Sequence, residues 1–212
     1  MIASVDSSFQ SAIDTLSLPG IMIGHRLISP GDERALMPEE AAAFAASVVE
    51  VRRASGAARI AARELLTRLG HPDCALPKSP SGAPTWPAGV VGSLAHDYRV
   101  AVAAVGHSRD IATVGIDVEP AEALPADLLD LVATPQELLK IADDPFQGRL
   151  LFVAKEAVYK AVYPLDQTFL EHHDVEVDLA GRKAVVRNGR VVELRFSMSA
   201  HIVALEIGRA HV

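Results

Sequence analysis

Two long helical patterns, each followed by short β-like runs, constrain the fold of this 212-residue chain most strongly. The first helical pattern covers about 39 to 69: Pro38 suits a helix start, the segment is rich in Ala, Glu, Arg and Leu, and Gly70 gives a stop. Gly56 is expected to break or bend this helix. Short, mostly apolar runs then predict three buried strands, over 89–96, 98–106 and 112–119.

The second helical pattern covers about 147 to 162 and follows a polar, helix-prone stretch after Pro120. Its apolar positions fall on one stripe, and Pro164 is expected to end it; the stripe consists of Leu151, Ala154, Val158, Ala161 and Val162. Four β-like runs follow, with turns at Gly181 and at Asn188–Gly189; they cover 175–179, 183–187, 190–198 and 201–207.

This repeated order predicts an α+β fold of two pseudosymmetric halves, each a helix packed on a small antiparallel sheet. The N-terminal half is expected to cover 1–112, and the C-terminal half 113–212. Half of the residues are apolar, and a chain of this length can bury about 70% of the surface that it exposes when unfolded. The core therefore needs no covalent crosslinks.

Composition excludes several classes of protein. The single cysteine, Cys74, rules out an internal disulfide framework and a multi-thiolate metal site. No apolar run approaches the roughly 20 residues of a membrane span, and the N-terminus lacks the features of a secretion signal, so a cytoplasmic protein is expected. The net charge of −7 argues against a general nucleic-acid binder.

The charge is unevenly distributed along the chain. Residues 51–80 hold six basic and two acidic side chains, whereas residues 117–146 hold eight acidic side chains and one base, Lys140. Such blocks are often solvated surfaces. The alternative is a basic site for an anionic ligand beside an acidic site for a cation.

Two carboxylates lie in the sequence Gly115-Ile-Asp117-Val-Glu119, at the end of a predicted strand. Side chains two residues apart on a strand point to the same face, so the two carboxylates project together. Paired oxygen ligands suit Mg²⁺, which proteins hold with one or two carboxylates and substrate phosphates. A strand end with two solvated acids is the alternative.

The second helix carries Lys155, Glu156 and Lys160. Glu156 and Lys160 have the spacing of an ordinary surface ion pair. Glu156 could instead be a third metal ligand or a general base, with the lysines on phosphate oxygens.

Basic side chains of the first half could bind phosphate. Arg52, Arg59 and Arg63 fall within about 40° of one another on a helical wheel, a stripe that suits phosphate or is simply solvated. Lys78 stands on a proline-stiffened loop that leads to Trp86, which could pack on a heterocycle or anchor the core.

In order, these motifs resemble the surfactin-type 4′-phosphopantetheinyl transferases, in the branch typified by enterobactin synthetase component D. The resemblance covers about 52 to 164, and the four motifs with these gaps are highly specific together. They are Lys78-x5-Pro84-x-Trp86-Pro87, Gly92-Ser93-Leu94-x-His96, Gly115-Ile-Asp117-Val-Glu119 and Lys155-Glu156-Ala157-x-x-Lys160.

The resemblance implies a monomer with coenzyme A (CoA) in the cleft between the halves. It implies transfer of phosphopantetheine from CoA to a serine of an apo acyl or peptidyl carrier protein, with release of adenosine 3′,5′-bisphosphate. The carrier is expected to be acidic and to dock on exposed basic and apolar residues near the cleft. Carriers of fatty acid, polyketide, nonribosomal peptide and siderophore synthesis remain alternatives.

Carried over by motif, the resemblance also implies roles for individual residues. Mg²⁺ would be held by Asp117, Glu119 and Glu156. Glu156, directly or through a metal-bound water, would take the serine proton, Lys160 would neutralise the leaving group, and Lys155 would assist. Contacts to CoA are implied for Arg52, Arg53, Arg59, Lys78, Ser93, His96, Lys155 and Lys160. Many relatives have Ser or Thr where this chain has Ala95, which puts one hydroxyl contact to CoA in doubt.

Two other functions fit the same residues. A Mg²⁺-dependent hydrolase of a nucleotide pyrophosphate such as CoA would use the same metal and base on water. A CoA-binding module without chemistry is disfavoured, because the carboxylates and Lys160 are all present. The run His172-His173-Asp174 is expected to be solvated, because adjacent residues rarely converge on a metal.

Overall fold

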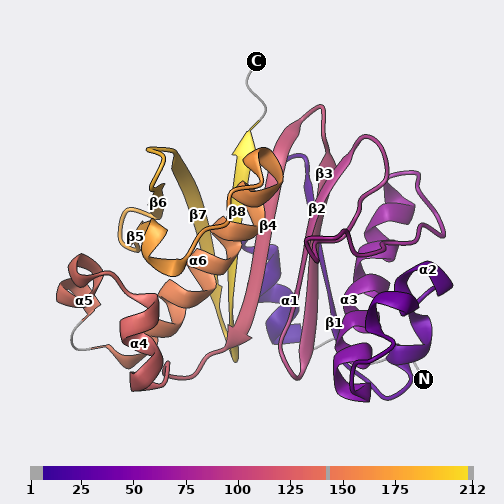
Figure 1. The fold of residues 1–212 in the computed structure, drawn as a ribbon, viewed down its shortest axis with the longest axis horizontal. Helices are drawn as coiled ribbons and strands as arrows, with labels where there is room; N and C mark the ends of the chain where they lie inside the picture. Colours follow the sequence, from indigo (N-terminus) through magenta and orange to yellow (C-terminus); the bar gives the residue numbers. More distant parts are fainter. Residues whose placement is uncertain (1–6, 142–143, 210–212) are drawn as a thin grey trace.

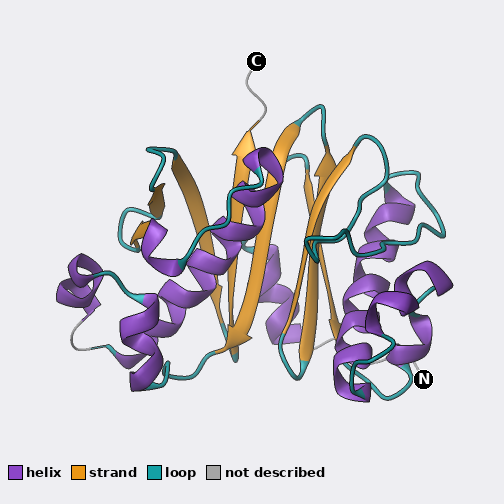
Figure 2. Cartoon of the chain, in the orientation of Figure 1, coloured by secondary structure: helices purple, strands orange, loops and turns teal. Residues whose placement is uncertain are grey.

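Two antiparallel sheets stand side by side in the computed structural model, which describes residues 7–141 and 144–209 (Figure 1). The first sheet has the strand order β1-β3-β2, and the second has the order β4-β8-β7-β6-β5. A long helix lies on each sheet: α3 covers the first and α6 the second (Figure 2). This is the α+β fold of helices and antiparallel sheets that the sequence predicts.

The first sheet is built from the N-terminal elements. These are α1 (Ser7–Asp14), β1 (Ile21–Leu27), the 3₁₀ turn η1 (Asp32–Ala35), α2 (Pro38–Ala41), the 3₁₀ turn η2 (Ala42–Phe44), α3 (Val49–Arg68), β2 (Val90–His96) and β3 (Val100–His107).

The second sheet and its helices follow. These are β4 (Ile111–Pro120), α4 (Ala126–Val132), α5 (Pro135–Ile141), α6 (Pro145–Asp166), the 3₁₀ turn η3 (His172–Asp174), β5 (Val175–Asp178), β6 (Lys183–Val186), β7 (Val191–Met198) and β8 (His201–Arg209).

The first predicted helix is wrong in its continuity. The segment 39–69 folds as α2, η2 and α3, and the helix is interrupted between Ala45 and Val48. Gly56 does not break α3. A β-carbon there would overlap the carbonyl oxygen of Asp32, so the glycine allows η1 to pack directly on α3.

The second predicted helix is confirmed and is longer than expected. The stripe residues from Leu151 to Val162 are each no more than 1% exposed. Pro164 does not end α6, which continues to Asp166 and stops at Gln167 in the left-handed region. A proline is tolerated here because only the last turn loses a backbone hydrogen bond.

Strand β1 was not predicted, although its sequence, IMIGHRL, is a short and largely apolar run. It pairs with β3 from Ile21 opposite Gly106 to Leu27 opposite Val100. The hydrophobic core beside it joins α1 to both sheets, with Phe9 and Ile13 against Val102 and Leu205. The two sheets therefore share core contacts, and the division at 112/113 stays a prediction.

A glycine sets the distance between β4 and α6. A β-carbon at Gly115 would overlap the carbonyl oxygen of Ala157, so only glycine lets the helix backbone rest on the strand. The Thr113 hydroxyl donates a 2.6 Å hydrogen bond to the carbonyl of Ala161 and fixes the same contact. As a result, the side chains at the end of β4 face those of α6.

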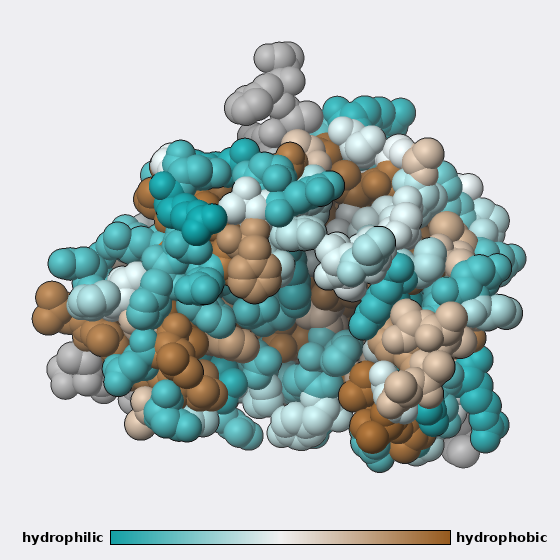
Figure 3. Space-filling model, viewed as in Figure 1, coloured by the Kyte–Doolittle hydropathy of each residue, from teal (hydrophilic) through white to brown (hydrophobic). Residues whose placement is uncertain are grey.

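None of the helices in the part of the chain that the structure describes has the length and apolar character required to cross a membrane. Exposed apolar side chains occur over α4 and at the start of α3, in the lower left and lower right of Figure 3. They include Leu128 and Leu131 over α4, and Val48 and Val51 at α3.

Strand β8 buries the carboxylate of Glu206. Glu206 is 1% exposed, and its Oε2 atom has no hydrogen-bond partner among the described residues. Burial raises the pKa of Glu206 to about 8, although the positive charge of Arg190 opposes this. The folded protein therefore binds a proton at Glu206 that the unfolded chain releases near pH 4.5.

This carboxylate should make stability fall as pH rises. Because the pKa of Glu206 is higher in the folded state, its contribution is favourable at pH 5 and is lost progressively toward pH 8, by up to about 4 kcal/mol. In Glu206→Gln this loss should be absent. The measurement is urea unfolding of both proteins at pH 5 and pH 8, and parallel pH profiles would contradict the prediction.

Candidate active site

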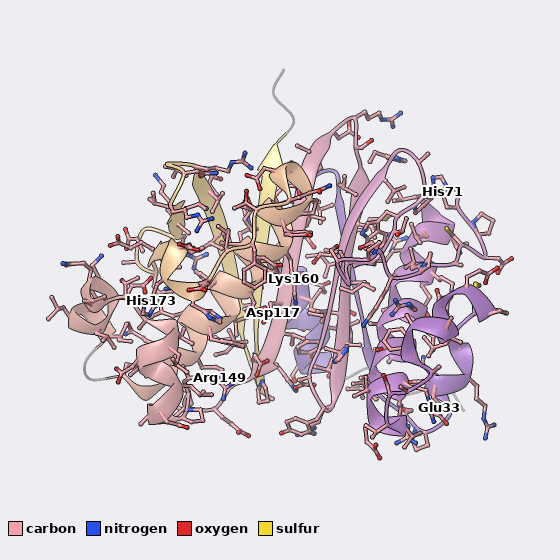
Figure 4. All side chains as sticks on the ribbon, viewed as in Figure 1. Glu33, His71, Asp117, Arg149, Lys160 and His173 are labelled. Carbon is pink, nitrogen blue, oxygen red and sulfur yellow. The ribbon has the colours of Figure 1, made fainter. Side chains whose placement is uncertain are left out.

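A partly buried ion pair joins β4 to α6 at the centre of the molecule (Figure 4). Lys160 Nζ donates a 2.6 Å hydrogen bond to Asp117 Oδ1 and lies 3.4 Å from the carbonyl of Ile116. The other carboxylate oxygen, Oδ2, is shielded from solvent and has no hydrogen-bond partner among the described residues. Burial raises the pKa of Asp117, and Lys160 opposes the rise.

Glu119, two residues further along β4, faces a base from the start of α6. Arg149 Nη1 donates to Glu119 Oε2 at 3.0 Å, and the same guanidinium reaches the carbonyls of Glu122 and Ala123. Burial first, and then the charge of Asp117, raise the pKa of Glu119. Arg149 was not singled out in the sequence, where it lacks a characteristic motif.

Glu156 faces η3, one helical turn before Lys160. His172 Nε2 lies 3.2 Å from Glu156 Oε1, and the His172 ring stacks on Phe152 at 5.5 Å between centroids. Burial alone would raise the pKa of Glu156, but the His172 contact and the charge of Lys160 lower it overall. The prediction that this histidine is solvated is wrong, because η3 folds back onto α6.

The three predicted metal ligands lie in the same region, but their side chains do not point at one common position. In the described part of the chain, no three acidic, histidine or cysteine side chains lie close enough together to coordinate one ion. Asp117, Glu119 and Glu156 instead each face a basic side chain. Yet the charge of Glu156 contributes to the raised pKa of Asp117, and the charge of Asp117 contributes to the raised pKa of Glu119. These mutually repelling carboxylates, with a free oxygen on Asp117, suit a hard cation after side-chain rotation.

Lys155 does not join this cluster, which corrects its predicted catalytic and CoA-binding role. Its side chain is 1% exposed, and Nζ donates to Glu137 Oε2 at 2.7 Å, to the Val132 carbonyl at 2.7 Å and to the His172 carbonyl at 2.9 Å. All three ammonium protons are thus occupied inside the protein. A lysine adjacent to Glu156 in sequence points to another side of α6, because successive helical residues diverge by about 100°.

Two of the predicted phosphate ligands, Arg52 and Arg53, lie near the N-terminus of α3. Arg52 donates to the carbonyl of Ser47 at 2.8 Å, and Arg53 pairs with Glu33 at 3.1 Å. Glu33 lies at the lower right of Figure 4, away from Asp117. The structure therefore does not bring Arg52 and Arg53 together with the carboxylates.

Arg59 and Lys78 do come together, across the ring of Phe44. The Arg59 guanidinium lies 5.0 Å and the Lys78 ammonium 4.3 Å from the ring centroid. Arg59 is 3% exposed, and its Nε donates to the Leu76 carbonyl. Burial and then Arg59 lower the pKa of Lys78. Arg63, the third member of the predicted stripe, is a structural clamp that donates to Glu40 and to the carbonyl of Ala35.

Strand β2 contributes Ser93 and His96. Ser93 is buried, and its hydroxyl accepts a 3.1 Å hydrogen bond from the Ile116 amide, so it joins β2 to β4. His96 is exposed at the strand end. Partial desolvation and then the positive charge of Lys160 lower its pKa, with a smaller contribution from Lys78. His96 therefore stands among the cations of the two halves.

Two cavities flank this part of α6. The larger has a volume of about 1110 Å³ and lies between the 79–84 loop, β2 and the end of α6, with Lys160 and Tyr163 on its wall. The smaller, of about 470 Å³, lies between α6 and the 169–175 segment and has Glu156 on its wall. Tyr159 lines both cavities.

Trp86 serves the core as well as the larger cavity. It packs against the cluster around Leu66 and Leu76, and it also lines the cavity. A β-carbon at Gly92 would lie 2.6 Å from the indole ring, so glycine is needed where β2 passes under Trp86. The core-anchor alternative for Trp86 is therefore confirmed, and its packing on a heterocycle stays a prediction.

Sequence comparisons identify relatives for both halves. The model of the 4′-phosphopantetheinyl transferase N-terminal domain matches residues 39–106, and that of the 4′-phosphopantetheinyl transferase superfamily matches residues 113–205. A protein of Nocardia iowensis named 4′-phosphopantetheinyl transferase Npt is 41% identical over 168 residues, which is 78% of this chain and 75% of the relative.

Two further relatives carry the same name. The 4′-phosphopantetheinyl transferase Svp of Streptomyces mobaraensis is 41% identical over 148 residues, covering 67% of this chain and 60% of the relative. The transferase PptT of Mycobacterium tuberculosis is 41% identical over 150 residues, covering 66% and 64%. The chain therefore belongs to the 4′-phosphopantetheinyl transferase superfamily and is a transferase of this type.

Proposed function

We propose that this protein transfers 4′-phosphopantetheine from CoA to a serine of an apo acyl or peptidyl carrier protein, as a surfactin-type, Mg²⁺-dependent enzyme that releases adenosine 3′,5′-bisphosphate. The observation that carries the proposal is the Asp117–Lys160 pair. It lies beside Glu156, between a groove suited to a nucleotide and a cavity suited to an uncharged chain.

The larger cavity fits the nucleotide part of CoA. Trp86 and Tyr163 on its wall offer flat surfaces to a base, and Lys160 offers a positive charge to phosphate. The charges of Lys160 and Lys78 both act on His96, so these two lysines lie near the histidine. Grouped cations suit a ligand with several phosphates.

The smaller cavity fits the pantetheine arm. Its wall is largely apolar, with Leu131, Tyr159 and Phe169 among its members. Because Tyr159 lines both cavities, they are neighbours along α6, and one ligand would run from the nucleotide groove past Glu156 into this cavity. The pyrophosphate would then lie near the three carboxylates.

Asp117, Glu119 and Glu156 would hold Mg²⁺. When bound, the ion would neutralise charge on the CoA pyrophosphate. In the structure the same carboxylates face Lys160, Arg149 and His172, so each carboxylate has a basic side chain beside it. The buried and unpartnered Oδ2 atom of Asp117 supports the assignment, because an isolated carboxylate oxygen inside a protein is otherwise costly.

The chemistry is a displacement at phosphorus. The serine oxygen forms a bond to the phosphorus that bears the pantetheine, and the bond from that phosphorus to the oxygen of adenosine 3′,5′-bisphosphate breaks. Glu156 takes the serine proton, since its lowered pKa keeps it ionised and able to accept. Lys160 neutralises the charge that develops on the leaving phosphate.

The carrier must bring its serine to Glu156. The surface next to the smaller cavity exposes Leu131 and Phe169, which are 64% and 68% exposed. An apolar contact here would bring the carrier serine to the side of α6 that carries Glu156. This side of the protein is therefore the proposed docking side.

Transfer and hydrolysis differ in whether CoA is consumed in the absence of a carrier. With CoA and Mg²⁺ supplied, a transferase consumes CoA only when an apo-carrier is added, and adenosine 3′,5′-bisphosphate appears in equal amount. A pyrophosphate hydrolase consumes CoA without a carrier. Chromatographic measurement of both nucleotides, with and without apo-carrier, tests the proposal, and consumption independent of the carrier would overturn it.

A further inference from the structure

The turn η3 places a histidine against the proposed general base. His172 Nε2 is 3.2 Å from Glu156 Oε1, which is ion-pair distance without hydrogen-bond geometry, and the Nε2 atom is shielded from solvent. Within the residues that the structure describes, Glu156 supplies the polar contact recorded for this nitrogen. One face of the imidazole stacks on the Phe152 ring, with the two ring planes 28° apart.

The backbone of His172 is also fixed by a hydrogen bond. Its carbonyl accepts a 2.9 Å hydrogen bond from Lys155, which also binds Glu137 and the end of α4. Glu137 is itself fixed, since it accepts from the amides of Thr134 and Val177. The buried Lys155–Glu137 pair thus connects α4, α5, β5 and η3 to α6.

This arrangement restricts one oxygen of Glu156 and leaves the other for chemistry. Besides His172, the charged groups that act on Glu156 are Lys160 and, through mutual repulsion, Asp117. They lie on the β4 side, whereas η3 lies on the side of the smaller cavity. A carboxylate that must both bind a cation and accept a proton needs such a fixed orientation.

We infer that His172 is a positioning residue that orients Glu156 for phosphopantetheinyl transfer, and that the buried Lys155–Glu137 pair holds His172 in place. The inference rests on the proposed function for its kinetic consequences. His172 acts through Glu156 and takes no proton from the substrate. Removal of an outer-shell partner that contacts a ligating carboxylate typically changes metal affinity or activity 10–100-fold.

The test compares three variants: His172→Ala removes the contact, His172→Gln keeps a donor, and His173→Ala is the matched control. The neighbouring His173 faces the carbonyl of Asp130 at 3.1 Å instead of Glu156. For His172→Ala we expect kcat to fall about 10–100-fold while KM for CoA changes by less than about threefold. His172→Gln should recover most of the loss, and His173→Ala should resemble the wild type.

A second measurement does not depend on turnover. Calorimetric titration of Mn²⁺ into each protein with CoA but no carrier should show about 10-fold weaker binding in His172→Ala and unchanged binding in His173→Ala. Equal kcat and Mn²⁺ affinity in the two alanine variants would overturn the inference. If the wild type transfers nothing to any carrier, the proposed function fails, and the Mn²⁺ titration still decides the role of His172. If His172→Ala does not fold, His172→Leu, which can still pack on Phe152 but has no polar group to contact Glu156, replaces it in both measurements with the same expected and contradicting results.

Discussion

Asparagine in place of Asp117 is expected to lower kcat for transfer by about 10²–10³-fold, because it removes a buried negative charge at the centre of the site. The amide keeps the shape of the carboxylate, so the packing of β4 on α6 should persist. The charge that faces Lys160 and the free Oδ2 atom would both be lost. Steady-state kinetics at several Mg²⁺ concentrations measure the effect, and the half-saturating Mg²⁺ concentration should also rise.

Asp110→Asn is the matched control for this substitution. Asp110 is a half-exposed carboxylate at the turn before β4 and pairs with Arg109 at the surface. Its removal should leave kcat and the Mg²⁺ requirement within about twofold of the wild type, as is usual for surface pairs. Equal kcat in the Asp117 and Asp110 variants would refute the central place given to Asp117.

Methionine in place of Lys155 should lower the free energy of unfolding by about 3–5 kcal/mol, because it leaves the Glu137 carboxylate buried without its counter-ion. Methionine fills a similar volume, so the loss comes from the charge and from three hydrogen bonds. Urea unfolding measures this effect. The transfer rate should fall as well, since the His172 backbone loses its donor.

Two further variants distinguish the stability lost by breaking the buried Lys155–Glu137 pair from the effect of removing any lysine. The double variant Lys155→Met/Glu137→Gln removes both charges and should regain a large part of the lost stability. Lys140→Met removes an exposed lysine of α5 and should change stability by less than about 0.5 kcal/mol. A loss below 1 kcal/mol in Lys155→Met would contradict the buried-pair assignment.

Local patterns predict the scaffold of this protein well. The apolar stripe of α6 depends on helix periodicity and the burial of β4 on a continuous apolar run, and both occur as expected. The break between α2 and α3 could not be predicted by helix propensity, because Ala45 and its neighbours favour a helix. What places the interruption is tertiary packing, in which Phe44 inserts beneath Arg59 and Lys78.

The partners of the site residues are less predictable from sequence. Asp117 and Lys160 are 43 positions apart and meet only because Gly115 lets α6 rest on β4. For Lys155 the sequence motif suggests a contact that the structure does not show. Its motif resembles that of catalytic lysines of the family, yet its ammonium group pairs with Glu137 inside the protein. The sequence also offers no periodic signal for His172, whose position depends on how η3 folds back.

Intact-mass measurement of an apo-carrier after incubation with the protein, CoA and Mg²⁺ tests the account most directly. We expect a gain of one phosphopantetheine on the carrier, no gain when its acceptor serine is replaced by alanine, and a strongly reduced gain with Asp117→Asn. An unchanged carrier mass across a panel of acyl and peptidyl carriers, with wild-type protein that is folded and supplied with Mg²⁺, would contradict phosphopantetheinyl transfer.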